Sequence, residues 1–137
     1  MAEQIQFELV SPERLLLSRP VDMVVVPGTE GDFGAMASHA PFISSLRPGV
    51  IAVYENGQVT DRLFVAGGFA EVTPERCTVL AERALPVSDL NRERIDSELR
   101  DARDDLVEAK DDHDRAEGER RVAVGEAMIE AMGTSVY

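Results

Sequence analysis

The pattern of the sequence changes near Pro86, and this change limits the possible folds more than any other feature. Before Pro86, short apolar runs are separated by turn-forming residues, whereas after it charged residues dominate and apolar residues recur at helical spacing. Short strands about eight to twelve residues apart are typical of a β-sandwich or barrel. We therefore predict a β + α fold: an N-terminal antiparallel β-sandwich over residues 1–87 and a C-terminal two-helix antiparallel hairpin over residues 88–137.

Alternation and turn signals support the predicted sandwich. Residues 5–10 (IQFELV) alternate apolar and polar side chains, as a half-buried strand requires. The dipeptide Asn56-Gly57 lies between two apolar runs and predicts a tight hairpin, because a type I′ turn needs positive φ at both central residues. Residues 73–76 (TPER) predict another tight turn. The pair Gly67-Gly68 indicates a bulge or a close approach of backbones.

Residues 88–112 predict a highly charged first helix. Ser88 or Asp89 is expected to cap its N-terminus. A narrow apolar stripe recurs at steps of three and four residues: Ile95, Leu99, Ala102, Leu106 and Ala109. Only three of these are large aliphatic residues, each worth ~1.5–3 kcal/mol when fully buried. We therefore expect a weakly docked arm that can detach.

The remaining C-terminal residues predict a second, shorter helix. Residues 113–118 (HDRAEG) are expected to turn the chain, and residues 119–133 to form the helix. Gly125 weakens this helix by ~1 kcal/mol relative to alanine. We interpret Met128 and Met132 as packing against the first helix. The short connection between the helices favours an antiparallel hairpin.

Composition excludes several classes of partner and site. The formal net charge of −12 repels a nucleic-acid backbone, so we expect no nucleic-acid partner. Cys77 is the single cysteine, which excludes an intramolecular disulfide and fits a reducing compartment. It alternates with Val79 and Ala81 and is interpreted as a buried apolar residue. No apolar run approaches the ~20 residues of a membrane span, so membrane association is expected only through a partner.

The residues that could support catalysis do not form a recognisable site. His39 is a candidate general base, with Ser38 or Ser44 as nucleophile, but no oxyanion-hole motif accompanies them. A serine hydrolase is therefore a secondary hypothesis, and a structural or interface role for His39 is preferred. His113 lies among aspartates and is interpreted as solvated. Residues 27–34 (PGTEGDFG) lack the order of a phosphate-binding loop. We predict no catalytic residue, no cofactor site and no metal site.

Residues 27–49 instead indicate a recognition surface. This stretch is rich in glycine and proline and carries its apolar residues singly. Loops held by a rigid sandwich are a common place for binding. The sequence therefore favours a binding module over an enzyme.

Two segments resemble a known family. The runs VPGTEGDFGAMASHAPFISSLRPGVI and VAGGFAEVTPERCTVLAERA resemble the ε subunit of bacterial F-type ATP synthase, which corresponds to the mitochondrial δ subunit. The family pattern is a G-x-E-G-x-x-G loop, then H-A-P, L-x-P-G, G-G-x-x-E-V and a V-L-A strand, followed by a helical hairpin. All of these occur here in that order, and the resemblance covers essentially the whole chain.

The resemblance implies a non-catalytic rotor subunit of the F1 central stalk, which links the γ subunit to the membrane c-ring and couples proton flow to ATP synthesis. It implies a peripheral location on the cytoplasmic face of the bacterial inner membrane. By motif match, a loop would face the c-ring, and its residues are Thr29, Glu30, Gly31, Asp32, Phe33 and Gly34. The carboxylates of Glu30 and Asp32 would meet basic or amide groups of the ring, and His39, Ala40 and Pro41 would contact γ. An unrelated β-sandwich adaptor is the alternative.

In some family members the hairpin binds ATP through an [IL]-D-x-x-R-A motif. The corresponding stretch here keeps Leu90 and Arg94 but has Asn91 in place of the aspartate and Ile95 in place of the alanine. We therefore expect weak or absent nucleotide binding.

In other members the second helix contacts the α and β subunits transiently and blocks rotation through basic residues. Here Arg115, Arg120 and Arg121 are interleaved with acidic residues. Attraction to an acidic segment of β should therefore be small and screened by salt. We expect the arm to inhibit ATP hydrolysis poorly, so that coupling and assembly are its main roles.

Overall fold

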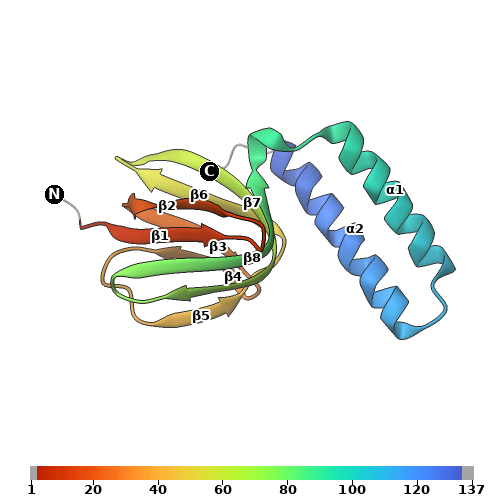
Figure 1. Cartoon of the computed structure of the whole chain (residues 1–137), viewed down its shortest axis with the longest axis horizontal. Helices are drawn as coiled ribbons and strands as arrows, with labels where there is room; N and C mark the ends of the chain where they lie inside the picture. Colours follow the sequence, from red (N-terminus) through yellow and green to blue (C-terminus); the bar gives the residue numbers. More distant parts are fainter. Residues whose placement is uncertain (1–2, 134–137) are drawn as a thin grey trace.

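The computed structural model describes residues 3–133, which form a bent sheet in two layers with a helical hairpin at one end (Figure 1). The strands are β1 (Ile5–Val10), β2 (Leu15–Val21), β3 (Met23–Gly28), β4 (Gly31–Ala35), β5 (Phe42–Ser45), β6 (Gly49–Glu55), β7 (Gln58–Val72) and β8 (Arg76–Pro86). A 3-10 turn, η1 (Val87–Asp89), leads to α1 (Arg92–Glu108) and α2 (Asp112–Gly133). The predicted fold class, a sandwich followed by two helices, is confirmed.

The strands of this described part form one open sheet in the order β2-β1-β8-β7-β6-β3-β4, with β5 paired to β7 beside that path. Neighbouring strands are antiparallel except β1 and β8, which run parallel. The expectation of an antiparallel sandwich holds apart from this pair. The parallel pair joins the first and last strands, so the whole sandwich serves as its connection.

Strand β7 is long and pairs with different strands before and after the pair Gly67-Gly68, where it bends. These residues have φ of +74° and +97°, and a Cβ on Gly68 would lie 1.9 Å from the carbonyl oxygen of Leu80. The predicted close backbone approach is therefore confirmed. The alternative of a bulge is wrong for the β7–β8 pair, which keeps one register on both sides of the glycines. The bend lets β7 pair first with β6 and then with β5.

Both predicted tight turns are present. Asn56 and Gly57 have φ of 55° and 76°, as the type I′ turn between β6 and β7 requires. Between β7 and β8, the Thr73 N–H donates to the Arg76 carbonyl at 2.8 Å. These turns fix the register of the long central strands.

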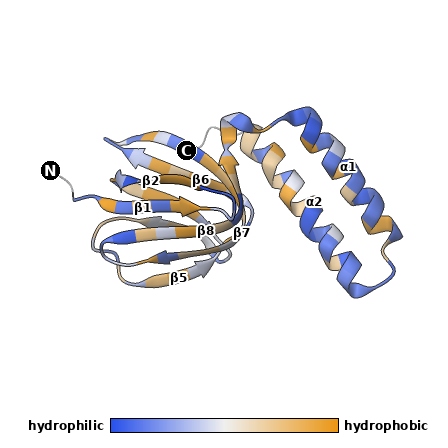
Figure 2. Ribbon diagram, in the orientation of Figure 1, coloured by the Kyte–Doolittle hydropathy of each residue, from blue (hydrophilic) through white to orange (hydrophobic). Residues whose placement is uncertain are grey.

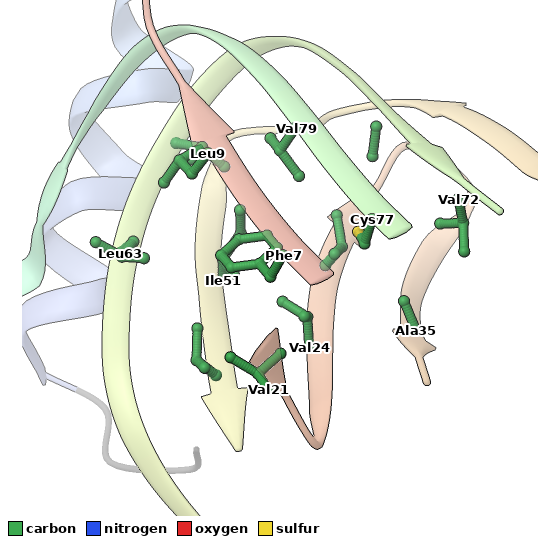
Figure 3. Packing of buried hydrophobic residues seen from close by; sticks show 14 of the residues in the cluster. Phe7, Leu9, Val21, Val24, Ala35, Ile51, Leu63, Val72, Cys77 and Val79 are labelled. Carbon is green, nitrogen blue, oxygen red and sulfur yellow. The ribbon is translucent and has the colours of Figure 1, made fainter. Parts of the chain in front are cut away.

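The core lies between the two layers. Alternate residues of β1 point inward and are fully buried, as the sequence predicts. Figure 3 shows Phe7 in the packed region with Ile51 and Val24. Cys77 is also buried, and this burial raises the pKa of its thiol to about 12. A thiol in this environment is not a reactive nucleophile, as predicted.

The first helix begins later than predicted. Residues 87–89 form the 3-10 turn, and Asn91, rather than Ser88 or Asp89, is the N-cap of α1. Asn91 has an extended backbone, and its side-chain oxygen accepts a hydrogen bond from the Arg94 N–H at 3.0 Å. Several residues here could act as caps. Because β8 continues to Pro86 and residues 87–89 form the 3-10 turn, Ser88 and Asp89 are not at the start of the helix, and Asn91 acts as the cap.

The second helix begins earlier than predicted. Residues 113–118 belong to α2 instead of turning the chain, and the turn lies just before Asp112. Asp111 accepts a hydrogen bond from the Asp114 N–H at 2.7 Å and so supports the first turn of the helix. Gly118 is not a helix breaker here: a Cβ would lie 3.2 Å from Leu106, so the glycine lets the two helices approach closely.

The hairpin contacts the sandwich through a second apolar cluster. It contains Phe64 and Ala66 of β7, Ile95 of α1, and Met128 and Ala131 of α2. Figure 2 shows that the half of α2 nearest the sandwich is the more apolar half. The prediction that the methionines pack against α1 is therefore only partly right. Met128 is buried and shares this cluster with both Ile95 and the sandwich, whereas Met132 is 40% exposed.

Candidate functional site

The loop implied to face the c-ring is the exposed tip of the β3–β4 hairpin. Strand β3 ends at Gly28, residues 29–30 form the turn, and β4 starts at Gly31. Gly31 has φ of +129°, a conformation that favours glycine. Most of the predicted segment, residues 29–34, is solvent-exposed, and Phe33 is half-buried. The sequence motif thus forms one continuous exposed surface, which we call the tip hairpin.

Backbone hydrogen bonds also join the tip hairpin and the end of β3 to residues 45–47. The Thr29 N–H donates to the Ser45 carbonyl at 2.9 Å, and the Arg47 N–H donates to the Pro27 carbonyl at 3.0 Å. A Cβ on Gly28 would lie 2.9 Å from both the Gly31 carbonyl oxygen and the Ser44 hydroxyl. This position therefore accepts only glycine without rearrangement. The end of β3 is held between β4 on one side and residues 45–47 on the other.

The two carboxylates of the tip hairpin have different surroundings. Asp32 forms an ion pair with Arg47, whose other guanidinium nitrogen Nη1 donates to the Gly28 carbonyl at 2.7 Å. Glu30 is exposed, and within residues 3–133 it has no ion-pair partner. Sequence reasoning treated Glu30 and Asp32 as equivalent and missed Arg47. No local signal links Arg47 to Asp32, because they are separated by fifteen positions.

Aromatic contacts join the tip hairpin to the predicted γ-facing corner. The rings of Phe33 and Phe42 meet edge to face at 5.0 Å and 76°. The His39 ring lies 6.4 Å from that of Phe42. His39 is half-buried, whereas Ala40 and Pro41 are exposed. The structure thus places residues 29–34 and 39–41 on neighbouring parts of one end of the sandwich.

The geometry does not support catalysis by His39. Its Nδ1 lies 2.5 Å from the carbonyl oxygen of Ala40. The Ser38 hydroxyl donates to Glu3 at 3.3 Å, and the Ser44 hydroxyl donates to the Ser45 carbonyl at 2.9 Å. Both hydroxyls thus bond away from His39, and the nucleophile–base contact that a serine hydrolase needs is not formed. The arrangement suits a structural or interface histidine.

A second surface was not identified from the sequence. Cross-strand pairing aligns residues of β7, β8, β1 and β2 on the outer face of the sheet, and we call this set the apolar row: Phe69, Leu80, Val10 and Leu15. Phe69, Leu80 and Leu15 are 43%, 41% and 56% exposed. Ile43 of β5 is 65% exposed and is a diagonal neighbour of Phe69. Exposed apolar patches of this kind commonly mark protein interfaces.

The residues of the degenerate nucleotide motif lie at the start of α1. Together they border a shallow pocket of about 310 Å³, whose lining includes Leu90, Asn91 and Arg94. The Asn91 side-chain oxygen is used to cap the helix, and Arg94 pairs with Glu98 at 3.3 Å. Asp89 and Glu98 of the same pocket offset the charges of Arg83 and Arg94. These contacts leave little to attract a triphosphate.

Neither a metal site nor a membrane span is found in the described chain. Over residues 3–133, His, Cys, Asp and Glu side chains form no group that could hold a metal ion. The helices of this same part are too short or too polar to cross a membrane.

Comparison with known proteins identifies the family. The family model described as "ATP synthase, Delta/Epsilon chain, beta-sandwich domain" matches residues 4–87. The ATP synthase epsilon chain of Rhodospirillum rubrum is 56% identical over 131 residues, which cover 96% of this chain and 98% of that relative. The epsilon chain of Paramagnetospirillum magneticum is 56% identical over 132 residues, covering 96% of this chain and 99% of that relative.

Solved structures show the same fold. A chain of the Euglena gracilis mitochondrial ATP synthase, from a structure of OSCP, F1 and the c-ring in rotational state 1, has a TM-score of 0.82 at 25% identity and covers 96% of this chain and 83% of its own. A chain from the central stalk and c-ring of the Tetrahymena thermophila mitochondrial enzyme has a TM-score of 0.67 at 12% identity, covering 96% and 98%, and supports the fold alone. From its sandwich match and its near full-length relatives, the chain belongs to the ATP synthase delta/epsilon chain family.

Proposed function

We propose that the chain is a non-catalytic subunit of the F1 central stalk, where it links the γ subunit to the membrane c-ring and couples proton flow to ATP synthesis. Membership of the delta/epsilon family supports this role. So does the fold shared with a chain from an assembly that contains F1 and a c-ring. The complex would hold the chain at the cytoplasmic face of the bacterial inner membrane.

The geometry supports a division between two surfaces. The tip hairpin is polar, exposed and stiff, which suits contact with the polar loops of a turning ring. The apolar row lies on the outer face of the sheet and suits a partner that covers it permanently. We assign the tip hairpin to the c-ring, and the apolar row, with the corner at residues 39–41, to γ. The sandwich would be the coupling part, and the C-terminal helical hairpin would be a stabilising arm.

The observation that carries the γ assignment is the apolar row. Replacing Phe69 or Leu80 by aspartate should weaken assembly with γ-containing F1 by about tenfold or more, because a charge would be buried against an apolar partner. Both side chains are outside the core, so the sandwich should stay folded. The effect is measured as the affinity of the purified full-length chain for F1 from which this subunit has been removed.

Val107 provides a matched control for these substitutions. It is an aliphatic residue of α1, it is 85% exposed, and it is absent from both surfaces. Val107→Asp should leave assembly with F1 unchanged. Equal affinities of the Phe69→Asp, Val107→Asp and unmodified chains would contradict the assignment of the apolar row to γ.

Family membership does not favour the alternative of an unrelated β-sandwich adaptor. Co-purification of the chain with the α, β and γ subunits tests this directly. The hydrolase hypothesis is disfavoured by the hydrogen bonds of Ser38 and Ser44. An assay of His39→Ala with simple esters tests it, since a hydrolase that used His39 would lose its activity.

We also propose that the helical hairpin inhibits ATP hydrolysis only weakly, through transient contacts with the α and β subunits. Each of three arginines of α2 pairs with an acidic residue of the hairpin itself: Arg115 with Asp112, Arg120 with Glu117 and Arg121 with Asp105. The hydrogen bond that Arg121 donates to the carboxylate of Asp105 raises the pKa of Arg121. These arginines have acidic partners already, so their net attraction to an acidic segment is small.

Removal of the hairpin tests this part of the proposal. Deleting the residues after Ser88 should barely change ATP hydrolysis by the assembled enzyme, while a several-fold rise would show that the arm is a strong inhibitor. Nucleotide binding by the same arm is expected to be weak or absent. Titration of the isolated full-length chain with ATP measures it, and saturation at micromolar concentrations would contradict the expectation.

A further inference from the structure

We infer that Arg47 is the positioning residue of the tip hairpin: it holds the turn in place and neutralises Asp32, so that Glu30 is the carboxylate that recognises a basic or amide group of the c-ring. This inference rests on the proposed contact between the tip hairpin and the ring. It assigns different roles to two acidic residues that the sequence motif treats alike.

Arg47 is placed to act on both strands of the tip hairpin. Its backbone N–H bonds to Pro27 at the end of β3, and its Nη1 donates to the carbonyl of Gly28 at 2.7 Å. Its Nη2 pairs with the carboxylate of Asp32 in β4. One side chain thus connects β3, β4 and the segment that precedes β6. Loss of the guanidinium would release the contacts with Gly28 and Asp32 together, while the backbone bond to Pro27 would remain.

The planar guanidinium suits this position better than an ammonium group. Two nitrogens in a fixed geometry can serve the Gly28 carbonyl and the Asp32 carboxylate at once. A lysine can neutralise Asp32 but presents a single nitrogen. The position therefore separates the two roles of Arg47: lysine keeps the charge and loses one part of the positioning.

Glu30 differs from Asp32 in both place and charge. It lies in the turn itself, is exposed, and has no ion-pair partner in residues 3–133, whereas the charge of Asp32 is offset by Arg47. A carboxylate at the apex of a stiff turn can approach a partner without losing an internal contact. Asp32 would have to exchange Arg47 for that partner. Recognition through Glu30 is therefore favoured.

Amide hydrogen exchange of the full-length chain tests the positioning role without the ring. The Thr29 N–H is bonded to Ser45, and it reports opening of the tip hairpin. In Arg47→Ala its exchange should be about three- to tenfold faster, and Arg47→Lys should fall between this variant and the unmodified chain. Arg92→Ala, which removes the Arg92–Asp96 pair of α1, is the control and should leave Thr29 unchanged. Unchanged exchange in Arg47→Ala would overturn the role of Arg47.

The role of Glu30 is tested by measuring how tightly the complex of F1 with this chain binds the purified c-ring in lipid vesicles. Glu30→Gln should weaken this binding by about threefold or more at low salt, with a smaller loss at high salt, and Asp32→Asn should have the lesser effect. The double variant Arg47→Ala with Asp32→Asn keeps the net charge of the chain but lacks the connection. Like Arg47→Ala, it should bind the ring less well than the unmodified complex.

The outcomes separate this inference from the proposed function. A larger loss from Asp32→Asn than from Glu30→Gln would overturn the assignment of Glu30 while keeping the ring contact. Full binding by the double variant would show that Arg47 acts through charge alone. If the unmodified complex did not bind the ring through this chain, the proposed ring contact and the role of Glu30 would both fail. The exchange of Thr29 would still decide whether Arg47 positions the tip hairpin.

Discussion

The sandwich and the helical hairpin bury their apolar residues in different ways. In the sandwich, side chains from strands distant in the sequence meet in one core, so each is held by several elements. The helical hairpin buries apolar residues along the seam between its own helices, where Leu99 of α1 lies against Gly125 of α2. Ile95 of α1 also belongs to the cluster shared with β7. A core shared by many strands resists partial opening, whereas a seam with one small attachment can separate from its support.

The attachment of the hairpin is correspondingly limited. Besides the second apolar cluster, Arg62 donates a hydrogen bond to the Ala131 carbonyl near the end of α2 at 3.1 Å. A cation at this end of a helix is favoured by the helix dipole. Between the hairpin and the sandwich there is also a cavity of about 690 Å³ with both acidic and basic residues in its lining. Contact between the two regions is therefore incomplete, as a detachable arm requires.

The largest expected effect is in the sandwich core. Phe7 is fully buried between the layers, and Phe7→Ala should lower the free energy of unfolding by ~3–5 kcal/mol through lost burial and a cavity. Urea unfolding of the full chain, followed by circular dichroism, measures this change. Phe69→Ala is a matched control, because the same side chain is removed from the exposed face, and it should cost less than ~1 kcal/mol. Equal costs would mean that the core is not the source of stability.

The same substitution at two glycines should sharpen the contrast. Gly68→Ala places a methyl group 1.9 Å from a backbone oxygen at φ of +97°, and it should cost ~3 kcal/mol or more. Gly125→Ala places it 2.9 Å from Leu99 Cδ1, the end of a flexible side chain. The helix gains ~1 kcal/mol from alanine there, so the net change should stay within ~1 kcal/mol. Thermal unfolding of both variants measures the difference, and a Gly125→Ala chain as unstable as Gly68→Ala would refute it.

These two glycines also show what the sequence could and could not predict. A Gly-Gly pair inside an apolar strand indicates a close backbone approach, and Asn56-Gly57 indicates a hairpin, because both depend on local φ. The role of Gly118 was missed because it depends on Leu106 of the other helix. In isolation, a glycine that ends a helix and a glycine that admits a neighbouring side chain look the same.

Surface residues were harder to assign than core residues. The motif located the tip hairpin and the His39 corner, but the different roles of Glu30 and Asp32 depend on Arg47, which reaches them through the fold. The apolar row was missed for a related reason. Residues 79–81 of β8 are apolar on both faces, so alternation alone could not show that Leu80 points outward.

The attachment of the hairpin can be weakened without disturbing the sandwich core. Met128 is 1% exposed and touches the cluster that joins the two regions. Met128→Ala should cost the docked arm about 2 kcal/mol. Amide exchange in α2 should then become faster, while exchange in the core strands of the sandwich stays as it was. Met132→Ala, at a 40% exposed position of the same helix, is the control and should change neither region. Uniformly faster exchange in both regions would show that they open as one unit.

The smallest expected effect concerns the start of α1, where Asn91 acts as the N-cap. Asn91→Ala removes the bond to the Arg94 N–H and should destabilise the hairpin by ~1 kcal/mol, with little effect on the sandwich. Asn91→Asp keeps an oxygen at the same place and restores the acidic residue of the family's nucleotide motif, so the helix should be as stable as before. Amide exchange at Arg94 and Ile95 measures the cap in both variants. Should Asn91→Asp bind ATP tightly while Asn91→Ala and the unmodified chain do not, this residue alone would account for weak nucleotide binding. Equally weak binding in all three would show that Asn91 is not the cause, and that the rest of the pocket, where Asp89 and Glu98 offset Arg83 and Arg94, limits binding.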